Sequence, residues 1–360
     1  MDAVTHPPLP VNEPVLDYAP GSAERASLEQ ALKAVTEPVE LDAIIGGVSR
    51  RPAGDAFQVV APFDHQRVLA TSANSIQSDA TDAVSAALDA APGWRALAFD
   101  DRAAILLKAA DLLAGPYRAR MNAATMLGQA KTAYQAEIDS ACELADFWRF
   151  NVHFGRQILE EQPIANSAGI WNRTDHRPLE GFVYAVTPFN FTAIAGNLPT
   201  APALMGNVVV WKPSTTQQLA ASLIMEILTA AGLPPGVINM LPGVGPEISE
   251  VLLAHPDLAG IHFTGSTRVF QQLWAGVGRN IGGYRAYPRM VGETGGKDFV
   301  VAHPSADIDV LRTALVRGSF EYSGQKCSAA SRSYIPASLW PRLKDRLIAE
   351  TEDLTIGSVE

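Results

Sequence analysis

The stretch Gly181-Phe-Val-Tyr-Ala-Val-Thr-Pro-Phe-Asn-Phe191 begins a new pattern in the 360-residue chain. From this point, short apolar runs alternate with segments of helical periodicity. The expected strands are 182–186, 207–211, 237–241 and 260–264, and the expected helices are 217–231, 247–254 and one after Ser266. Strands that alternate with helices are typical of βα units, so we predict an α/β fold with a parallel sheet.

The segments on either side of this region extend the prediction. Residues 22–159 are mostly helical, with amphipathic stretches at 81–91, 102–113 and 121–159, and short strands at 57–63 and 67–72 joined by a turn at Asp64-His65. The Pro-rich residues 7–20 indicate an extended arm, and 169–180 a projecting hairpin. A strand at 299–302 and a helix from Asp307 to about residue 320 indicate a second α/β unit.

Composition narrows the classes of function. Hydrophobic residues make up 47% of the chain and charged residues 18%, as in a globular protein with room for two domains. The net charge of −10 argues against nucleic-acid binding, and no apolar run is long enough to cross a membrane. Two distant cysteines and the absence of zinc-ligand spacings predict no disulfide and no metal site. We therefore expect a cytoplasmic protein that acts on a small molecule.

Cys327 has sequence neighbours that suit a nucleophile. A free thiol is only a few per cent ionised at neutral pH, so a catalytic cysteine needs backbone N–H groups, a nearby cation or a base. Gly324 permits a tight approach of the chain, and Lys326 adds a positive charge beside the cysteine in sequence. Most lone cysteines are packing residues. That is our interpretation of Cys142, whose apolar neighbours recur at helical spacing.

Two motifs at expected strand ends predict a nucleotide site. The turn Phe263-Thr-Gly-Ser-Thr-Arg268 opens a helix, whose positive dipole end can bind phosphate, although an ordinary N-cap is the alternative. Lys212 follows another strand, at the carboxyl edge where open α/β sheets bind ligands. A solvated lysine is the commoner case. Together they indicate an adenine nucleotide with Lys212 on the ribose and Gly265-Ser266 near the pyrophosphate.

Two further side chains suit acyl chemistry. Asn190 follows a strand end, where its amide could stabilise a developing oxyanion; the alternative is a turn residue that satisfies its own backbone. Glu293 lies in Gly292-Glu-Thr-Gly-Gly-Lys297, and a partly desolvated carboxylate there could act as general base. Otherwise Glu293 is a loop carboxylate.

Five motifs occur in a characteristic order. They are Thr187-Pro-Phe-Asn-Phe191, Trp211-Lys-Pro-Ser214, Phe263-Thr-Gly-Ser-Thr267, Glu293-Thr-Gly-Gly-Lys297 and Gly324-Gln-Lys-Cys327. In order, spacing and residue type, the chain resembles the aldehyde dehydrogenase superfamily over most of its length. Within that family, 189–207 and 320–329 are similar to the members that oxidise L-glutamate γ-semialdehyde, formed from Δ1-pyrroline-5-carboxylate in proline degradation.

The resemblance implies a role for each matching residue. Cys327 matches the nucleophile, Glu293 the general base and Asn190 the transition-state stabiliser. Phe191 and Ser328 match positions that line the semialdehyde pocket. The positions that contact the cofactor NAD are matched by Thr187, Lys212, Gly265, Ser266, Thr267, Arg268 and Val269. The implied reaction passes through a thiohemiacetal and a thioester on the cysteine.

The resemblance also implies an architecture. A Rossmann-type NAD-binding domain covers 1–165 and 182–288, a β-hairpin for oligomerisation 166–181, and a partial α/β catalytic domain 289–360. Family members continue well beyond this point, so the resemblance predicts an incomplete enzyme whose complete form is a homo-oligomer. Three alternatives stay open: a dehydrogenase of another aldehyde, an inactive NAD-binding module, and a cysteine hydrolase.

Overall fold

The computed structural model describes residues 6–360, which divide into two compact units. The first unit runs to Glu293 and includes Glu360, and the second is Thr294–Val359. Both units combine helices with parallel strands, so the predicted α/β class is confirmed. No helix within residues 6–360 is both long enough and apolar enough to span a bilayer.

A seven-stranded sheet forms the centre of the first unit, with strand order β10-β9-β6-β7-β8-β2-β3. Its parallel core confirms the four predicted strands, because β6 pairs with both β7 and β9, and β7 pairs with β8. The whole of β6 is buried, which explains its unbroken apolar sequence. The strands are β2 (Ala43–Ile45), β3 (Val48–Arg50), β6 (Phe182–Val186), β7 (Val208–Lys212), β8 (Ile238–Met240), β9 (Leu258–Gly265) and β10 (Arg289–Thr294).

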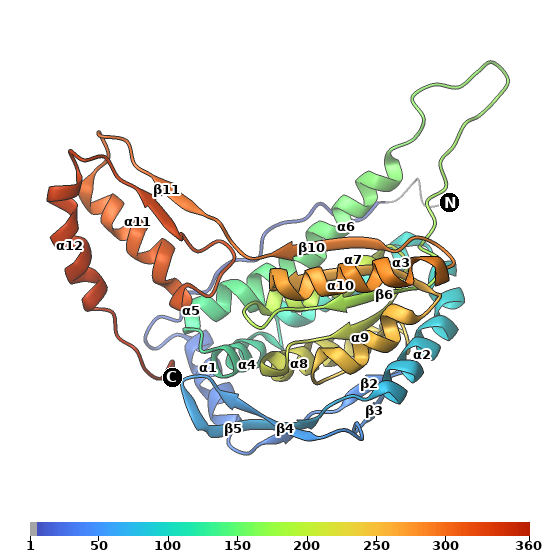
Figure 1. Cartoon of the computed structure of the whole chain (residues 1–360), viewed down its shortest axis with the longest axis horizontal. Coiled ribbons are helices and arrows are strands. Elements are labelled where there is room, and N and C mark those ends of the chain that lie inside the picture. Colours follow the sequence, from blue (N-terminus) through green and yellow to red (C-terminus); the bar gives the residue numbers. More distant parts are fainter. Residues whose placement is uncertain (1–5) are drawn as a thin grey trace. The chain divides into compact units, whose positions relative to one another are not determined.

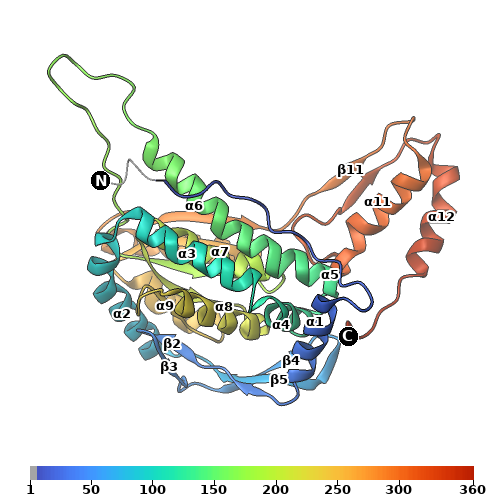
Figure 2. The ribbon, with the colours of Figure 1, turned by 180° about the vertical axis from the view of Figure 1, so that it is seen from behind.

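Helices cover both faces of this sheet. In Figure 1, α10 lies in front of the sheet, and the view from behind in Figure 2 brings α3 and α6 forward. The predicted helices after β7, β8 and β9 are confirmed as α8, α9 and α10. The helices are α1 (Ala23–Ala34), α2 (Gln77–Ala96), α3 (Phe99–Ala114), α4 (Arg118–Gln129), α5 (Ala133–Ala136), α6 (Leu144–Glu160), α7 (Thr192–Leu204), α8 (Gln218–Ala231), α9 (Gly245–Ala254) and α10 (Thr267–Asn280).

The expected helical stretch 121–159 is interrupted. Ala130 adopts a left-handed conformation with φ 56°, which ends α4, and Thr132 then caps the start of α5 through a capping box with Gln135. A π-helix, Glu137–Glu143, connects α5 to α6. The helical periodicity predicted the helices but not this break, because an alanine carries no sequence signal for left-handed backbone.

A second sheet has strand order β1-β5-β4, with β1 (Val39–Glu40), β4 (Ala56–Ala61) and β5 (Asp64–Ala73). Strands β4 and β5 confirm the predicted pair, but β5 already begins at Asp64, so the turn lies at 62–63.

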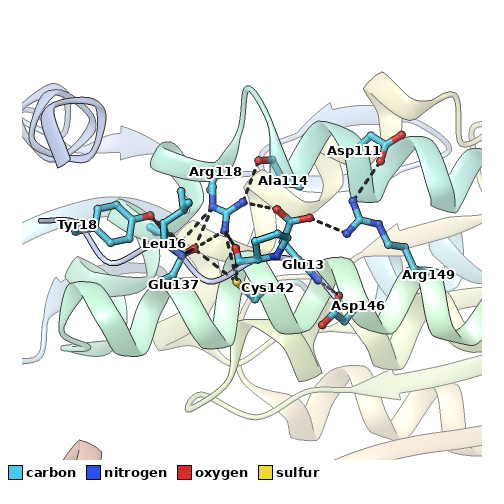
Figure 3. Close-up of polar contacts among 12 residues, drawn as sticks. Glu13, Leu16, Tyr18, Asp111, Ala114, Arg118, Glu137, Cys142, Asp146 and Arg149 are labelled. Carbon is cyan, nitrogen blue, oxygen red and sulfur yellow. Dashed lines mark hydrogen bonds and ion pairs between the residues drawn. The ribbon is translucent and has the colours of Figure 1, made fainter. Parts of the chain in front are cut away.

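The predicted N-terminal arm is confirmed as an extended segment held by ion pairs (Figure 3). The carboxylate of Glu13 bridges Arg118, at 2.6 Å, and Arg149, at 2.7 Å. The buried carboxylate of Glu137 also pairs with Arg118 and accepts a hydrogen bond from the Tyr18 hydroxyl. Ion pairs and a hydrogen bond between side chains therefore hold the arm against the helices.

Residues 161–181 project from the first unit as a long loop (Figures 1 and 2). The projection agrees with the expected hairpin, but its arms form no strands. The side chain of Gln162 instead accepts from the Thr174 amide at 3.0 Å and donates to the Thr174 carbonyl at 3.3 Å. Ile164 and Trp171 are 105% and 69% exposed, so these large apolar side chains make little contact that could promote strand pairing.

The second unit contains β11 (Phe299–Val301) parallel to β12 (Arg332–Tyr334), with α11 (Ile308–Phe320) and α12 (Trp340–Glu352). Asp307 begins α11 as predicted, because its carboxylate accepts from the amides of Asp309 and Val310. The core of this unit is formed by Ile308, Leu311, Leu315, Leu339 and Leu343.

Candidate functional site

Three predicted motifs leave the sheet from neighbouring parallel strands. Val186, at the end of β6, is in register with Lys212 of β7 and with Phe263 of β9. The chain proceeds from β6 to β7 and β8 on one side and returns to β9 on the other, so β6 is a topological switch point. Open α/β sheets bind ligands at the carboxyl edge beside such a point.

Thr187 and Lys212 lie together at this edge. The Thr187 amide donates to the Lys212 carbonyl at 3.2 Å, and the Trp211 indole donates to the Thr187 hydroxyl at 2.9 Å. Burial lowers the pKa of Lys212 to about 8, and within residues 6–360 no carboxylate compensates this loss of hydration. A cation held partly dry and without a counter-ion suits a polar or anionic ligand.

The turn after β9 begins a helix, as predicted. Ser266 is the N-cap of α10, and its hydroxyl accepts from the Val269 amide at 3.3 Å. This is the ordinary capping contact that sequence left as the alternative. The amides of Thr267 and Arg268, in the exposed first turn, have no intrahelical acceptor. Capping and anion binding are therefore compatible at this helix end, since they use different N–H groups.

Asn190 and Phe191 form the turn between β6 and α7. Asn190 lies in a bend, and Phe191 is the N-cap residue of α7 but has no side-chain oxygen to cap it. The ring of Phe191 lies 4.2 Å from the ammonium of Lys131. The turn is therefore joined to the helical layer through residues that the sequence analysis did not select.

Glu293 lies near the end of β10, and its residue is exposed. The sequence analysis predicted a partly desolvated carboxylate at this position, and the structure does not show that burial. The neighbouring Gly292 packs closely within the protein, because a Cβ there would lie 2.2 Å from the ring of Phe270.

Cys327, in the second unit, is partly buried and follows an unusual backbone. Tyr322, Ser323 and Gly324 all have left-handed conformations, with φ of 53°, 54° and 69°. Such conformations cost energy in non-glycine residues and cluster at functional sites. The ammonium of Lys326 lies 3.6 Å from the Glu321 carboxylate, so its positive charge is shared rather than reserved for the thiol.

Within this unit the structure brings two of the motifs together. A Cβ on Gly296 would lie 2.0 Å from the carbonyl oxygen of Cys327, a separation that only glycine permits. The following Ser328 is exposed. The Gly-Gly motif therefore packs on the backbone of the candidate nucleophile.

Cys142 is buried in the π-helix, where burial raises its pKa to about 12. The prediction of a packed thiol is confirmed. The residues that sequence analysis missed are Lys131 and Asp139, which form a buried ion pair at 2.5 Å. In sequence they look like the polar side of a helix, and no motif distinguishes them. Groups of three or more side chains suited to hold a metal ion do not occur within residues 6–360.

Comparison with known proteins identifies the family. A family model described as the aldehyde dehydrogenase family matches residues 49–360. The Δ1-pyrroline-5-carboxylate dehydrogenase of Agaricus bisporus is 49% identical over 349 residues, which are 96% of this chain and 64% of the relative. The mitochondrial enzyme of that name from Homo sapiens is 46% identical over 346 residues, covering 96% of this chain and 61% of the relative.

Solved structures give the same result. The Δ-pyrroline-5-carboxylate dehydrogenase of Mycobacterium tuberculosis, in a crystal structure with bound NAD, superimposes with a TM-score of 0.97 at 61% identity. The match covers 100% of this chain and 67% of that one. The chain thus spans less than two thirds of the two curated relatives named above, at 64% and 61% of their length.

Proposed function

The chain belongs to the aldehyde dehydrogenase family, and from this premise we propose that it carries out the NAD-dependent oxidation of L-glutamate γ-semialdehyde to L-glutamate. The observation that carries the proposal is the meeting of Thr187, Lys212 and the start of α10 at one sheet edge. The names of the relatives, at 46–49% identity, support the choice of substrate.

The residues at this edge fit a dinucleotide. Lys212 offers a cation that has no counter-ion within residues 6–360, and Thr267 and Arg268 offer amides at the positive end of α10. Gly265, Ser266 and Val269 complete the turn that would hold the pyrophosphate. Bound NAD would supply the acceptor for a hydride. The NAD-bound relative from Mycobacterium tuberculosis supports this assignment.

In the proposed reaction the Cys327 thiolate attacks the aldehyde carbon, and the carbonyl electrons move to oxygen. The side-chain amide of Asn190 stabilises this oxyanion by donating a hydrogen bond. Loss of hydride restores the carbonyl as a thioester. Glu293 then takes a proton from the water that attacks the thioester, the C–S bond breaks, and glutamate leaves. Phe191 and Ser328 would line the pocket for the aldehyde.

The direct test is NADH formation from Δ1-pyrroline-5-carboxylate by the full chain. Cys327→Ala should reduce the rate to background, whereas Cys142→Ala should leave it within about twofold, since that thiol is a buried packing group. Asn190→Ala should lower kcat about 100- to 1000-fold. Aldehydes without a distal carboxylate should react more slowly.

Four results would contradict this proposal in different ways. Turnover that survives Cys327→Ala would remove the nucleophile assignment. A preference for uncharged aldehydes would favour another dehydrogenase of the family. Binding of NAD in calorimetry without any thiol-dependent turnover would leave a nucleotide-binding module, and ester hydrolysis without NAD would indicate a hydrolase.

We also propose that the protein forms a homo-oligomer through residues 166–181. The exposed Ile170 and Trp171 on the projecting loop support this, because large apolar side chains are usually covered by a partner. Light scattering of the wild type and of Trp171→Ser tests it: a monomer in both cases would contradict it. A cytoplasmic location remains a prediction, and the human relative is named as mitochondrial.

A further inference from the structure

A buried ion pair lies next to the turn that carries Asn190. The side chains of Lys131 and Asp139 are only 1% and 4% exposed, and the ammonium nitrogen lies 2.5 Å from Oδ2 of the carboxylate. Burying two charges costs several kcal/mol for each ion unless their hydrogen bonds are satisfied. An ion pair buried here therefore needs further hydrogen-bond partners. Those partners show which part of the chain the pair holds in place.

The carboxylate of Asp139 caps helix α7 from outside that helix. Its Oδ2 accepts from the Thr192 amide at 3.0 Å, and its Oδ1 accepts from the Ala193 amide at 3.2 Å. Phe191, the N-cap residue, makes no side-chain capping bond. Both oxygens of Asp139 are thus bound to the first turn of α7, which fixes the backbone directly after Asn190.

Lys131 contacts the same turn through the ring of Phe191. Its ammonium pairs with Asp139 and lies 4.2 Å from the centre of the Phe191 ring, within the range of a cation–π contact. The Thr192 hydroxyl is bound as well, at 2.8 Å from the Thr125 hydroxyl and 2.6 Å from the Gln129 amide nitrogen. Backbone amides, aromatic ring and hydroxyl are therefore all fixed by buried groups.

Glu137 and Asp139 lie two residues apart in the π-helix 137–143, so their side chains point towards different neighbours. Glu137 and Asp139 are both buried, yet Glu137 binds the N-terminal arm and Arg118 while Asp139 binds α7 and Lys131. Short π-helical turns occur frequently at functional sites. This one carries two ion clusters that serve different elements, so each can be changed separately.

We propose that Lys131 and Asp139 are positioning residues that hold the Asn190–Phe191 turn for aldehyde oxidation. The inference rests on the function proposed above. Asp139 fixes the start of α7 and thereby the backbone of Asn190, the oxyanion donor. Lys131 neutralises Asp139 and holds the ring of Phe191, which would line the aldehyde pocket. Neither residue touches the reacting atoms in this scheme.

The test compares Asp139→Asn with Glu137→Gln in the full chain. Both substitutions replace a buried, ion-paired carboxylate of the same π-helix by its amide, but of the two only Asp139 accepts hydrogen bonds from α7. Hydrogen exchange of a peptide spanning 187–195, followed by mass spectrometry, should become at least about tenfold faster in Asp139→Asn. It should stay within about twofold of wild type in Glu137→Gln.

Kinetics give a second readout that a purely structural role would not change. Asp139→Asn should lower kcat about 10- to 100-fold and leave the Kd for NAD within about twofold. In an Asn190→Ala background, the same substitution should lower kcat by less than about threefold, because the group it positions is already gone. Should Asp139→Asn fail to fold, the double variant Lys131→Met/Asp139→Asn removes both buried charges and should show the same fast exchange.

Wild-type exchange at 187–195 in folded Asp139→Asn would overturn the inference. So would an equal loss of kcat in Glu137→Gln, or losses that multiply fully with Asn190→Ala. If the wild-type chain shows no turnover that depends on Cys327, the proposed function fails. Hydrogen exchange would then decide by itself whether this ion pair holds the turn.

Discussion

Lys212→Met should stabilise the protein without ligand while it weakens NAD binding. Burial lowers the pKa of this lysine from its ordinary 10.5 to about 8. At about 1.36 kcal/mol for each unit of pKa, keeping the ammonium charged in the folded protein at pH 7 costs about 3 kcal/mol. Methionine has a similar length and no charge, so the substitution removes this cost.

The direction of the pKa shift of Lys212 determines how the stability difference between wild type and variant depends on pH. Below pH 8 the lysine is protonated in the folded and the unfolded chain, and the full cost is present. Between about pH 8 and 10.5 the unfolded chain binds more protons, so the stability of the wild type rises with pH. Above that range both states are neutral. The advantage of Lys212→Met should therefore shrink from about 3 kcal/mol at pH 7 towards zero at about pH 10.5.

Denaturant unfolding at the two pH values measures this difference. Wild type and variant are compared in the same buffer, so the titration of other groups cancels. Lys108→Met, which replaces an exposed lysine, is the matched control and should change stability by less than about 0.5 kcal/mol at either pH. A Lys212→Met variant that is less stable than wild type at pH 7, or equally favoured at both pH values, would refute the reasoning.

Calorimetry with NAD completes this test. A hydrogen bond to a charged group contributes about 1.5–3 kcal/mol, so Lys212→Met should weaken NAD binding about 10- to 100-fold. A lysine with a purely structural role would not combine higher stability with lower affinity. Unchanged affinity would remove Lys212 from the cofactor site while leaving the stability prediction intact.

Three shorter predictions concern glycines and thiols. Gly181→Ala should destabilise the protein by about 1–3 kcal/mol in denaturant unfolding, because Gly181 has φ 131° and its Cβ would lie 2.0 Å from a backbone carbonyl oxygen. Gly296→Ala should destabilise the second unit by a similar amount in the same assay and alter the labelling rate of Cys327, whereas Gly357→Ala, with nothing within 4 Å, should do neither. Iodoacetamide at pH 7 should label Cys327 in the native protein and Cys142 only after denaturation, since burial raises the pKa of Cys142 to about 12. Mass spectrometry measures the labelling, and an adduct on Cys142 in the native protein would contradict this prediction.

The sheet could be predicted because the burial of each strand is visible in the residues of that strand alone. A parallel strand buried on both faces is usually a nearly continuous apolar run, and β6 and the first four residues of β7 show this directly. Their carboxyl ends then locate Thr187 and Lys212 at one edge without any coordinates. The break after Ala130 and the strandless arms of 161–181 could not be predicted in this way. The first depends on a left-handed alanine, and the second on side-chain hydrogen bonds between distant residues.

Lys131 and Asp139 illustrate a different limit. The partners of Asp139 on α7 are backbone amides, and every residue except proline presents the same N–H group, so the contact has no signature in the sequence of α7. The sequence signal that remains is the lack of a capping side chain at the start of α7. The side chain of Phe191 has no atom that can accept a hydrogen bond, and a buried helix end cannot leave its first amides to water. A distant acceptor is therefore required, and an acidic residue in a neighbouring apolar helix is the first candidate to examine.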